Sequence, residues 1–216
     1  MSDVYVNLDD ASQTGVTVGF VNRYLALEGG DGSGKSTVAA ALAERLEALG
    51  EQVVVVREPG GTPVGEVIRT LLLDSDELDD WAEVFLFAAQ RAELAREVIA
   101  PALDEGRWVI SDRTYYSSIA YQGRGRGLGE VEVREINERG LDGVLPDYVF
   151  VLDVDAPTAL ARQHREDRIG REGVEFQEKL RSAYRDLATS EPDKVYILSG
   201  SSSVDDLVDR ILAVAR

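Results

Sequence analysis

One eight-residue stretch constrains this chain more than any other feature: residues 29–36, which read GGDGSGKS. They satisfy the phosphate-binding pattern G-x-x-x-x-G-K-[ST] at every defined position. A short apolar run at 24–27 precedes the stretch and a helix-forming run at 37–49 follows it, so the loop lies between a strand and a helix, as the pattern requires. The sequence therefore predicts a site for the phosphates of a nucleoside triphosphate.

The residue types in this loop have separate physical roles. Glycines adopt backbone conformations closed to residues with a Cβ, so successive N–H groups turn inward around the phosphates, and the following helix adds the positive end of its dipole. We expect Lys35 to reach the β- and γ-phosphates and the Ser36 hydroxyl to bind Mg²⁺. The residues expected to bind ATP are Gly29, Gly30, Asp31, Gly32, Ser33, Gly34, Lys35, Ser36 and Thr37.

The rest of the chain alternates between two kinds of segment. Short apolar runs typical of buried parallel strands recur at 53–56, 108–110, 148–152 and 195–198. Helical stretches lie between or after them, at 64–72, 82–103, 130–139, 157–165, 174–189 and 204–216. This alternation predicts one α/β domain over 23–216, with a parallel sheet covered by helices. Residues 1–22 have no sustained periodicity and are interpreted as an N-terminal extension, for which disorder is one reading.

Composition narrows the function classes. The absence of cysteine excludes disulfides and thiolate chemistry, and the single histidine, His164, leaves no easily built Ser-His-Asp triad. A net charge of −17 argues against a nucleic-acid partner, because phosphate contacts need a basic face. No apolar run approaches the roughly 18 residues of a membrane span, and the acidic N-terminus is unlike a signal peptide, so we expect a cytoplasmic protein.

The charged residues are also skewed in type, with 40 acidic residues against 20 arginines and 3 lysines. Carboxylate-rich surfaces of this kind are typical of salt-loving organisms, in which molar salt screens the mutual repulsion. An ordinary acidic protein is the alternative. Folding and activity that are unaffected by transfer from molar KCl to dilute buffer would count against a halophilic origin.

Two segments follow predicted strands. Residues 57–63, REPGGTP, contain a proline and two glycines that predict a rigid turn, which places Arg57 and Glu58 at the carboxyl edge of the sheet, where α/β proteins bind ligands. The run WVISDR ends the third strand in Asp112 and Arg113. A carboxylate there suits Mg²⁺ coordination and an arginine suits bidentate phosphate contact, although a simple strand-end ion pair is the alternative.

Four segments, GGDGSGKST, REPGGTP, FAAQR and DRTYYSSIAYQG, occur in the order seen in thymidylate kinases, and the chain resembles that family over about residues 23–216. The resemblance implies transfer of the γ-phosphoryl group of ATP to dTMP with Mg²⁺. It also implies a homodimer and a three-layer P-loop NTPase fold, whose five-stranded parallel sheet has the order 2-3-1-4-5. Two alternatives stay open: a kinase for another acceptor, such as dUMP, dCMP or a deoxynucleoside, and a nucleotide-dependent switch that has lost transfer.

The resemblance also implies roles on the acceptor side. Phe87 would stack on thymine, Arg91 would contact the monophosphate, and Tyr121 would pack beside the deoxyribose and disfavour a 2′-hydroxyl. The spacing of Phe87 and Arg91 puts both on one helix face, although core packing is the alternative for Phe87. Asp31 would hold the 3′-hydroxyl. The implied substrate-binding residues are Asp31, Glu58, Phe87, Arg91, Arg113, Ser117, Ser118, Tyr121 and Gln122.

The segment RQHREDRIGRE, in a lid expected at about 162–172, concentrates arginine in an acidic protein. In the family the catalytic arginine comes from the phosphate loop or from the lid, and the loop here has none, so the resemblance implies the lid-arginine type. Arg165 is the first candidate, with Arg168 and Arg162 behind it, while a solvated helix face is the alternative. The expected catalytic residues are therefore Lys35, Arg113, Arg165 and Asp31, and the expected metal ligands are Ser36 and Asp112.

Overall fold

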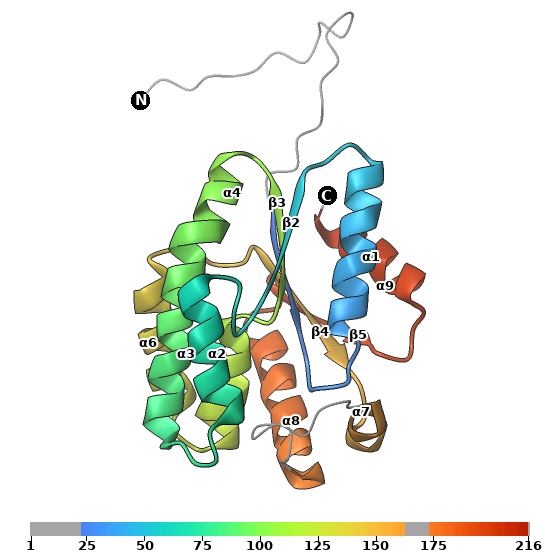
Figure 1. Cartoon of the computed structure of the whole chain (residues 1–216). Coiled ribbons are helices and arrows are strands. Elements are labelled where there is room, and N and C mark those ends of the chain that lie inside the picture. The colour runs from blue at the N-terminus through green and yellow to red at the C-terminus, as the bar shows by residue number, and fades with distance from the viewer. Residues whose placement is uncertain (1–22, 163–172, 216) are drawn as a thin grey trace, which may run out of the picture.

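A computed structural model describes residues 23–162 and 173–215, and within them five parallel strands form one sheet in the order β2-β3-β1-β4-β5 (Figure 1). The strands are β1 (Tyr24–Glu28), β2 (Val53–Arg57), β3 (Trp108–Asp112), β4 (Tyr148–Asp153) and β5 (Val195–Ser199). β1 is central, because Leu25 pairs with Ile110 on one side and with Tyr148 on the other. The predicted fold class and strand order are confirmed.

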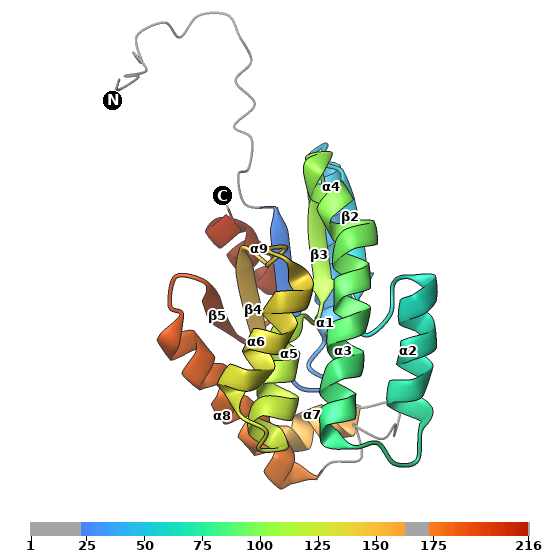
Figure 2. The ribbon, with the colours of Figure 1, turned by 90° about the vertical axis from the view of Figure 1, so that its left-hand side faces the viewer.

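Helices cover both faces of the sheet (Figures 1 and 2). They are α1 (Lys35–Ala48), α2 (Pro63–Asp74), α3 (Asp80–Leu94), α4 (Ala100–Asp104), α5 (Tyr115–Ser118), α6 (Glu130–Leu141), α7 (Ala156–Arg162), α8 (Val174–Ser190) and α9 (Val204–Ala215). Two π-helical turns, η1 (Ala95–Ile99) and η2 (Ile119–Gly125), continue α3 and α5. None of the described helices is both long and apolar enough to cross a membrane.

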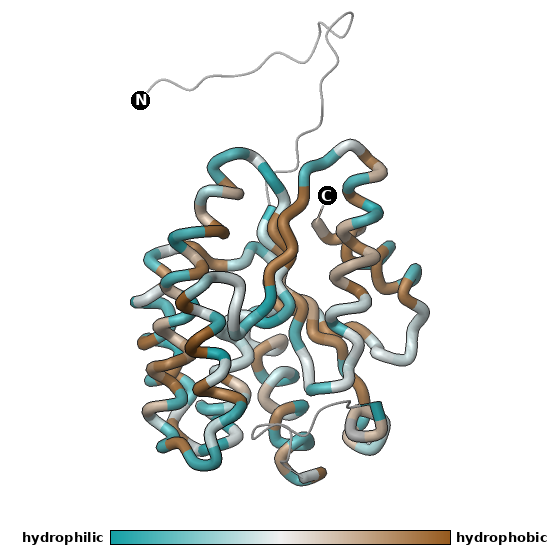
Figure 3. Tube along the Cα trace, viewed as in Figure 1, coloured by the Kyte–Doolittle hydropathy of each residue, from teal (hydrophilic) through white to brown (hydrophobic). Residues whose placement is uncertain are grey.

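Alternate side chains of the strands separate the two halves of the core. Leu25 and Leu27 pack with α1 and α9, whereas Ala26 belongs to the cluster formed with α3, α5 and α8. Because both faces of β1, β3 and β4 are buried, these strands are apolar along most of their length, as Figure 3 shows in brown. The edge strands β2 and β5 are also apolar, although Val55 and Ile197 on them are exposed. Short continuous apolar runs in the sequence therefore predict all five strands.

Two helical segments depart from simple expectations. The helix expected over 82–103 is present, but it widens into η1 just before Pro101, whose missing N–H and bulky ring disrupt the regular α-helical pattern. The segment of α5 and η2 was not among the helices expected from periodicity. Tyrosine, serine and glycine favour helix weakly, and here Thr114 caps the first turn by accepting a hydrogen bond from the Tyr116 N–H (3.4 Å).

The carboxyl ends of β1, β2 and β3 meet at one edge of the sheet. β1 leads into the glycine-rich loop and α1, β2 into the turn before α2, and β3 into the turn before α5. These three turns are brought together because adjacent parallel strands end side by side. The three sequence segments that carried functional predictions therefore converge on one place.

Candidate functional site

The glycine-rich loop wraps around the side chain of its own lysine. Gly34 has φ +93° directly before α1, and a Cβ on Gly32, which has φ +77°, would collide with the Ala159 carbonyl oxygen. Lys35 Nζ donates to the carbonyl oxygens of Gly29 (3.2 Å) and Gly30 (2.9 Å). Burial, with a smaller contribution from the Arg113 charge, lowers the pKa of Lys35 to about 8.

A hydroxyl and a carboxylate meet at the start of α1. Ser36 Oγ donates to Asp112 Oδ2 over 2.5 Å, so the two predicted metal ligands lie together. Both are hard oxygen ligands of the kind that Mg²⁺ prefers. Among the described residues no group of three or more acidic or histidine side chains forms a metal site by itself. This donor set fits an ion that takes its other ligands from phosphate oxygens and water.

Arg113 connects the third strand to the loop. Its backbone has φ +78°, an unfavourable value for a residue with a Cβ, and its N–H donates to the Leu27 carbonyl (2.9 Å). One guanidinium nitrogen donates to Gly29 O and Ser117 Oγ, both at 3.0 Å, and the other pairs with Asp31. The arginine side chain is therefore held against the phosphate loop from two sides.

Asp31 is the acidic member of this loop. Burial raises the pKa of its carboxyl, but the charges of Arg113 and Lys35 outweigh that effect, so the pKa of Asp31 lies below its ordinary value. The ionised carboxylate of Asp31 forms an ion pair with Arg113 and also lies near the positive charge of Lys35. Asp31 is thus stable as an anion next to a site that would hold phosphates.

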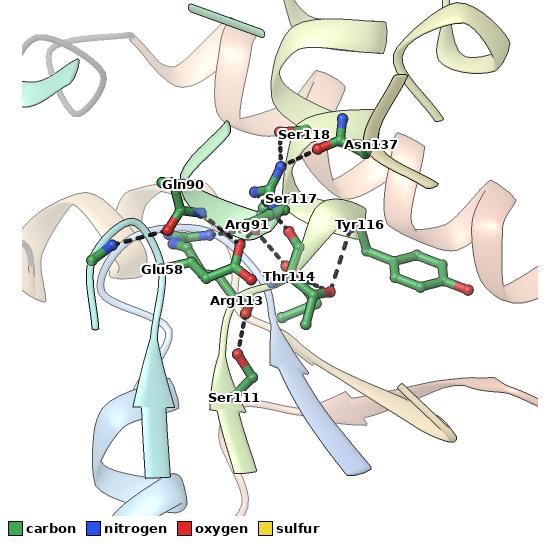
Figure 4. Close-up of polar contacts among 12 residues, drawn as sticks. Glu58, Gln90, Arg91, Ser111, Arg113, Thr114, Tyr116, Ser117, Ser118 and Asn137 are labelled. Carbon is green, nitrogen blue, oxygen red and sulfur yellow. Dashed lines mark hydrogen bonds and ion pairs between the residues drawn. The ribbon is translucent and has the colours of Figure 1, made fainter. Parts of the chain in front are cut away.

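Arg91 lies at the centre of a fully buried polar cluster (Figure 4). Its guanidinium pairs with Glu58 and donates to Ser118 Oγ (2.7 Å), Asn137 Oδ1 (2.6 Å) and the Thr114 carbonyl (3.1 Å). Burial raises the pKa of Glu58 to about 7 even though Arg91 lowers it. The cluster joins α3, α5, α6 and the turn after β2, so it fixes their relative positions.

Gln90, the neighbour of Arg91 in the FAAQR segment, joins that segment to the REPGGTP turn. Its Nε2 donates to Glu58 Oε2 (3.3 Å), and its Oε1 accepts from the Gly60 N–H (3.1 Å). Figure 4 shows both contacts beside the Arg91 cluster. Arg57 itself turns away and pairs with the exposed Glu66 (3.0 Å). The two motifs are therefore parts of one assembly, with Glu58 rather than Arg57 facing inward.

Glu28 is a site residue that the sequence reasoning missed. Its carboxylate is fully buried and accepts from Thr114 N–H (2.7 Å), Thr114 Oγ1 (2.8 Å), Ser117 Oγ (2.6 Å) and Tyr184 OH (2.8 Å). These contacts connect the end of β1 to the turn that carries Arg113 and to α8. The available signal was a charged residue at the end of an otherwise apolar strand, immediately before the phosphate loop.

A partly open pocket, here called the inner cavity, lies among these side chains. It is lined by Asp31, Glu58, Pro59, Arg69, Leu73, Phe87, Arg91, Arg113, Ser117, Ser118, Tyr121 and Gln122. All nine residues predicted to bind the acceptor substrate are in this set, and their individual roles stay predictions. Arg69, which donates to the Pro59 carbonyl (2.6 Å), was missed, because an arginine on an amphipathic helix normally faces solvent.

An open cleft, here called the outer cleft, lies along the phosphate loop. Its lining includes residues 31–37 of the loop and its helix, Asp112, Arg162 and the turn at 200–202. Gly29 and Gly30, the first two residues of the loop, lie against Leu152 of β4 and Gln177 of α8, respectively. Four residues line both spaces: Asp31, Glu58, Arg69 and Arg113. The outer cleft and the inner cavity therefore share one wall.

The predicted lid is described only at its first residue. Arg162 ends α7 with an exposed side chain and lines the outer cleft. Arg165, Arg168 and Arg171 lie outside the described residues, as does His164. Among the candidate lid arginines, Arg162 alone has a described position, at the edge of the cleft.

Comparisons with known proteins agree with this geometry. The model of the thymidylate kinase family matches residues 27–211. A thymidylate kinase from Synechococcus sp. (strain JA-3-3Ab) is 41% identical over 193 residues, which are 89% of this chain and 95% of that protein. One from Halothermothrix orenii is 47% identical over 172 residues, 76% of this chain and 83% of that protein.

Among solved structures, a thymidylate kinase from Ehrlichia chaffeensis superposes with a TM-score of 0.76 and 31% sequence identity, covering 90% of this chain and 98% of that one. The residues that the family model matches, 27–211, include the phosphate loop and the positions that line the inner cavity. From the family match and these relatives together, the chain belongs to the thymidylate kinase family.

Proposed function

We propose that the protein transfers the γ-phosphoryl group of ATP to dTMP, giving dTDP and ADP. The observation that carries this proposal is the shared wall: the phosphate-loop cleft and the inner cavity meet at Asp31 and Arg113. A switch protein needs only the cleft. A second cavity with an aromatic side chain and three arginines suits a nucleoside monophosphate, which has one flat base and a dianionic phosphate.

In this proposal the two nucleotides enter from opposite sides of the shared wall. The phosphates of ATP lie in the loop with Lys35 beside them, and the adenine lies toward the turn at 200–202. The base of dTMP rests on Phe87, and its phosphate faces Arg113, which with Arg91 aligns it. The acceptor atom is already an ionised phosphate oxygen, so transfer needs positioning and charge stabilisation rather than a general base.

Mg²⁺ fits the oxygen pair of Ser36 and Asp112. When bound there, it would supply positive charge for the phosphate oxygens of ATP. Positive charge on the transferring group would also come from a lid arginine, Arg165 first and then Arg168 and Arg162. Arg162 supports this arrangement because it already lies on the wall of the outer cleft.

The lowered pKa of Lys35 predicts how kcat/KM for ATP depends on pH. The pKa of Lys35 is lowered to about 8, so above that pH the free protein loses the charge that attracts the ATP phosphates. Bound phosphates favour the charged lysine, so ATP binding takes up a proton there. We expect kcat/KM for ATP to be level below pH 8 and to fall about tenfold per pH unit between 8.5 and 9.5. Initial rates at subsaturating ATP test this, and a level profile up to pH 9.5 contradicts it.

The acceptor is tested with a panel of substrates. ADP formation is followed in molar KCl, as the acidic composition suggests. The acceptors are dTMP, dUMP, dCMP, thymidine and the ribonucleotide of thymine (TMP), which differs from dTMP by its 2′-hydroxyl. The highest kcat/KM is expected for dTMP, and the discrimination against TMP should decrease in Tyr121→Ala. A higher value for another acceptor would make the protein a kinase of that compound.

We also infer that the protein forms a homodimer. Val67 and Leu71 on α2 are 64% and 48% exposed, and Phe85 on the adjoining α3 is 57% exposed, a concentration of apolar surface that suits a second copy. Sedimentation velocity should give a dimer for the wild type and a monomer for the Val67→Glu, Phe85→Glu double variant. A monomeric wild type at micromolar concentration would contradict the inference.

A further inference from the structure

A second buried carboxylate lies beside the inner cavity and takes no part in holding phosphate. Glu83 is on α3, one helical turn before Phe87, and its side chain is fully buried. Its Oε1 accepts from Gln122 Nε2 over 2.5 Å and from Arg126 Nε over 3.3 Å, and its Oε2 accepts from Arg126 at 3.4 Å. Arg126 provides a counter-charge for the Glu83 carboxylate, which also accepts the hydrogen bond from the Gln122 amide.

The contact with Glu83 decides which way the Gln122 amide points. A carboxylate paired with an arginine only accepts hydrogen bonds, so the amide nitrogen must face it and the amide oxygen must face the other way. Gln122 is 2% exposed and lines the inner cavity, and within 23–162 and 173–215 its Oε1 has no donor. The cavity wall therefore offers a fixed hydrogen-bond acceptor.

We propose that Glu83 is a positioning residue that determines base selectivity, by making Gln122 present an acceptor to a ring N–H of the base that rests on Phe87. This inference rests on the proposed function. Thymine has a donor at N3, whereas N3 of cytosine is itself an acceptor and would face Gln122 Oε1 without a proton between them. The arrangement thus favours dTMP and disfavours dCMP, and it treats dUMP like dTMP because uracil also has an N3–H.

The variant Glu83→Gln tests this directly. Glutamine has nearly the same shape, but it both donates and accepts, so it can pair with either orientation of the Gln122 amide. The ratio of kcat/KM for dTMP to that for dCMP should fall about tenfold or more. The dissociation constant for dCMP divided by that for dTMP, both measured by calorimetry, should fall in parallel. The dTMP to dUMP ratio and the KM for ATP should stay within about twofold of the wild type, which loss of packing alone would not predict.

Asp80→Asn is the matched control, because Asp80 also lies near Arg126 (3.4 Å) and does not contact Gln122. It should leave the dTMP to dCMP ratio unchanged. A wild-type ratio retained in folded Glu83→Gln overturns the inference and leaves the proposed function standing. A wild type that uses dTMP and dCMP equally refutes both. If Glu83→Gln does not fold, Glu83→Met decides, because it removes the acceptor that orients Gln122 and keeps most of the volume: a tenfold smaller ratio supports the inference, and an unchanged ratio overturns it.

Discussion

Replacing Lys35 by alanine is expected to lower kcat/KM for ATP by about 10³-fold, the upper end of what one preorganised donor contributes in a catalytic site. The lysine is 6% exposed inside the phosphate loop, where its ammonium group donates to the Gly29 and Gly30 carbonyl oxygens and is available to the ATP phosphates when they bind. Stopped assays with the purified variant over a range of ATP concentrations measure the loss. Activity within tenfold of the wild type would exclude Lys35 from the site.

The same substitution should leave the fold intact. The pKa of Lys35 falls from 10.5 to about 8 on folding, so burying its charge opposes folding by on the order of 3 kcal/mol below pH 8. That cost is relieved as the pH rises from about 8 toward 10.5. At pH 7 we therefore expect Tm of Lys35→Ala to equal or exceed that of the wild type. Lys179→Ala, which removes only an exposed pair with Glu175, is the control with unchanged activity.

Replacing Arg91 by alanine is expected to have the largest effect on stability, a loss of about 3–5 kcal/mol near neutral pH, because it leaves Glu58 buried without a counter-charge. The pKa of Glu58 already lies near 7 and must rise further without Arg91. Relative to the wild type, the part of the destabilisation that comes from the Glu58 charge should therefore increase as the pH rises from about 7 toward the new pKa, whereas the part that comes from the lost hydrogen bonds to Ser118, Asn137 and Thr114 should be present at every pH. Urea denaturation at pH 5 and pH 8 gives the two free energies of unfolding.

A double variant distinguishes the effect of the unpaired Glu58 charge on stability from the effect of the lost side-chain volume of Arg91. Arg91→Met with Glu58→Gln removes both charges and keeps most of the volume, so it should recover most of the stability at pH 8. Both Arg91 variants should raise KM for dTMP far more than KM for ATP. Equal losses for the two substrates would remove Arg91 from the acceptor site and leave it as the structural link between α3, α5 and α6.

The elements predicted from sequence are those whose signals are local. Strands such as β2 contain a short continuous apolar run, here 53–56, and the phosphate loop carries its glycines, lysine and serine within eight residues. The helix that begins at Tyr115 escaped prediction because its stability comes from packing rather than from its tyrosines and serines. Local pattern therefore predicted the sheet and the position of the site.

Contacts between distant parts of the chain were not predictable in the same way. Arg91 bonds Asn137, which is 46 positions away, and Glu28 bonds Tyr184, which is 156 positions away. Nothing in the neighbourhood of either acceptor in the sequence identifies its partner, because the fold alone brings them together. For the same reason, the sequence predicts only that Glu83 is an acidic residue on a helix, and its contact with Gln122 is known from the fold alone.

The central claim is that a phosphoryl group passes from ATP to an acceptor held in the inner cavity, and the most direct test follows the label from [γ-³²P]ATP. With dTMP present, the label should appear in dTDP in amounts equal to the ADP formed, with almost none as inorganic phosphate. Without dTMP, ATP should stay intact. Label released as inorganic phosphate at the same rate with and without dTMP would show hydrolysis without transfer, and would contradict the account.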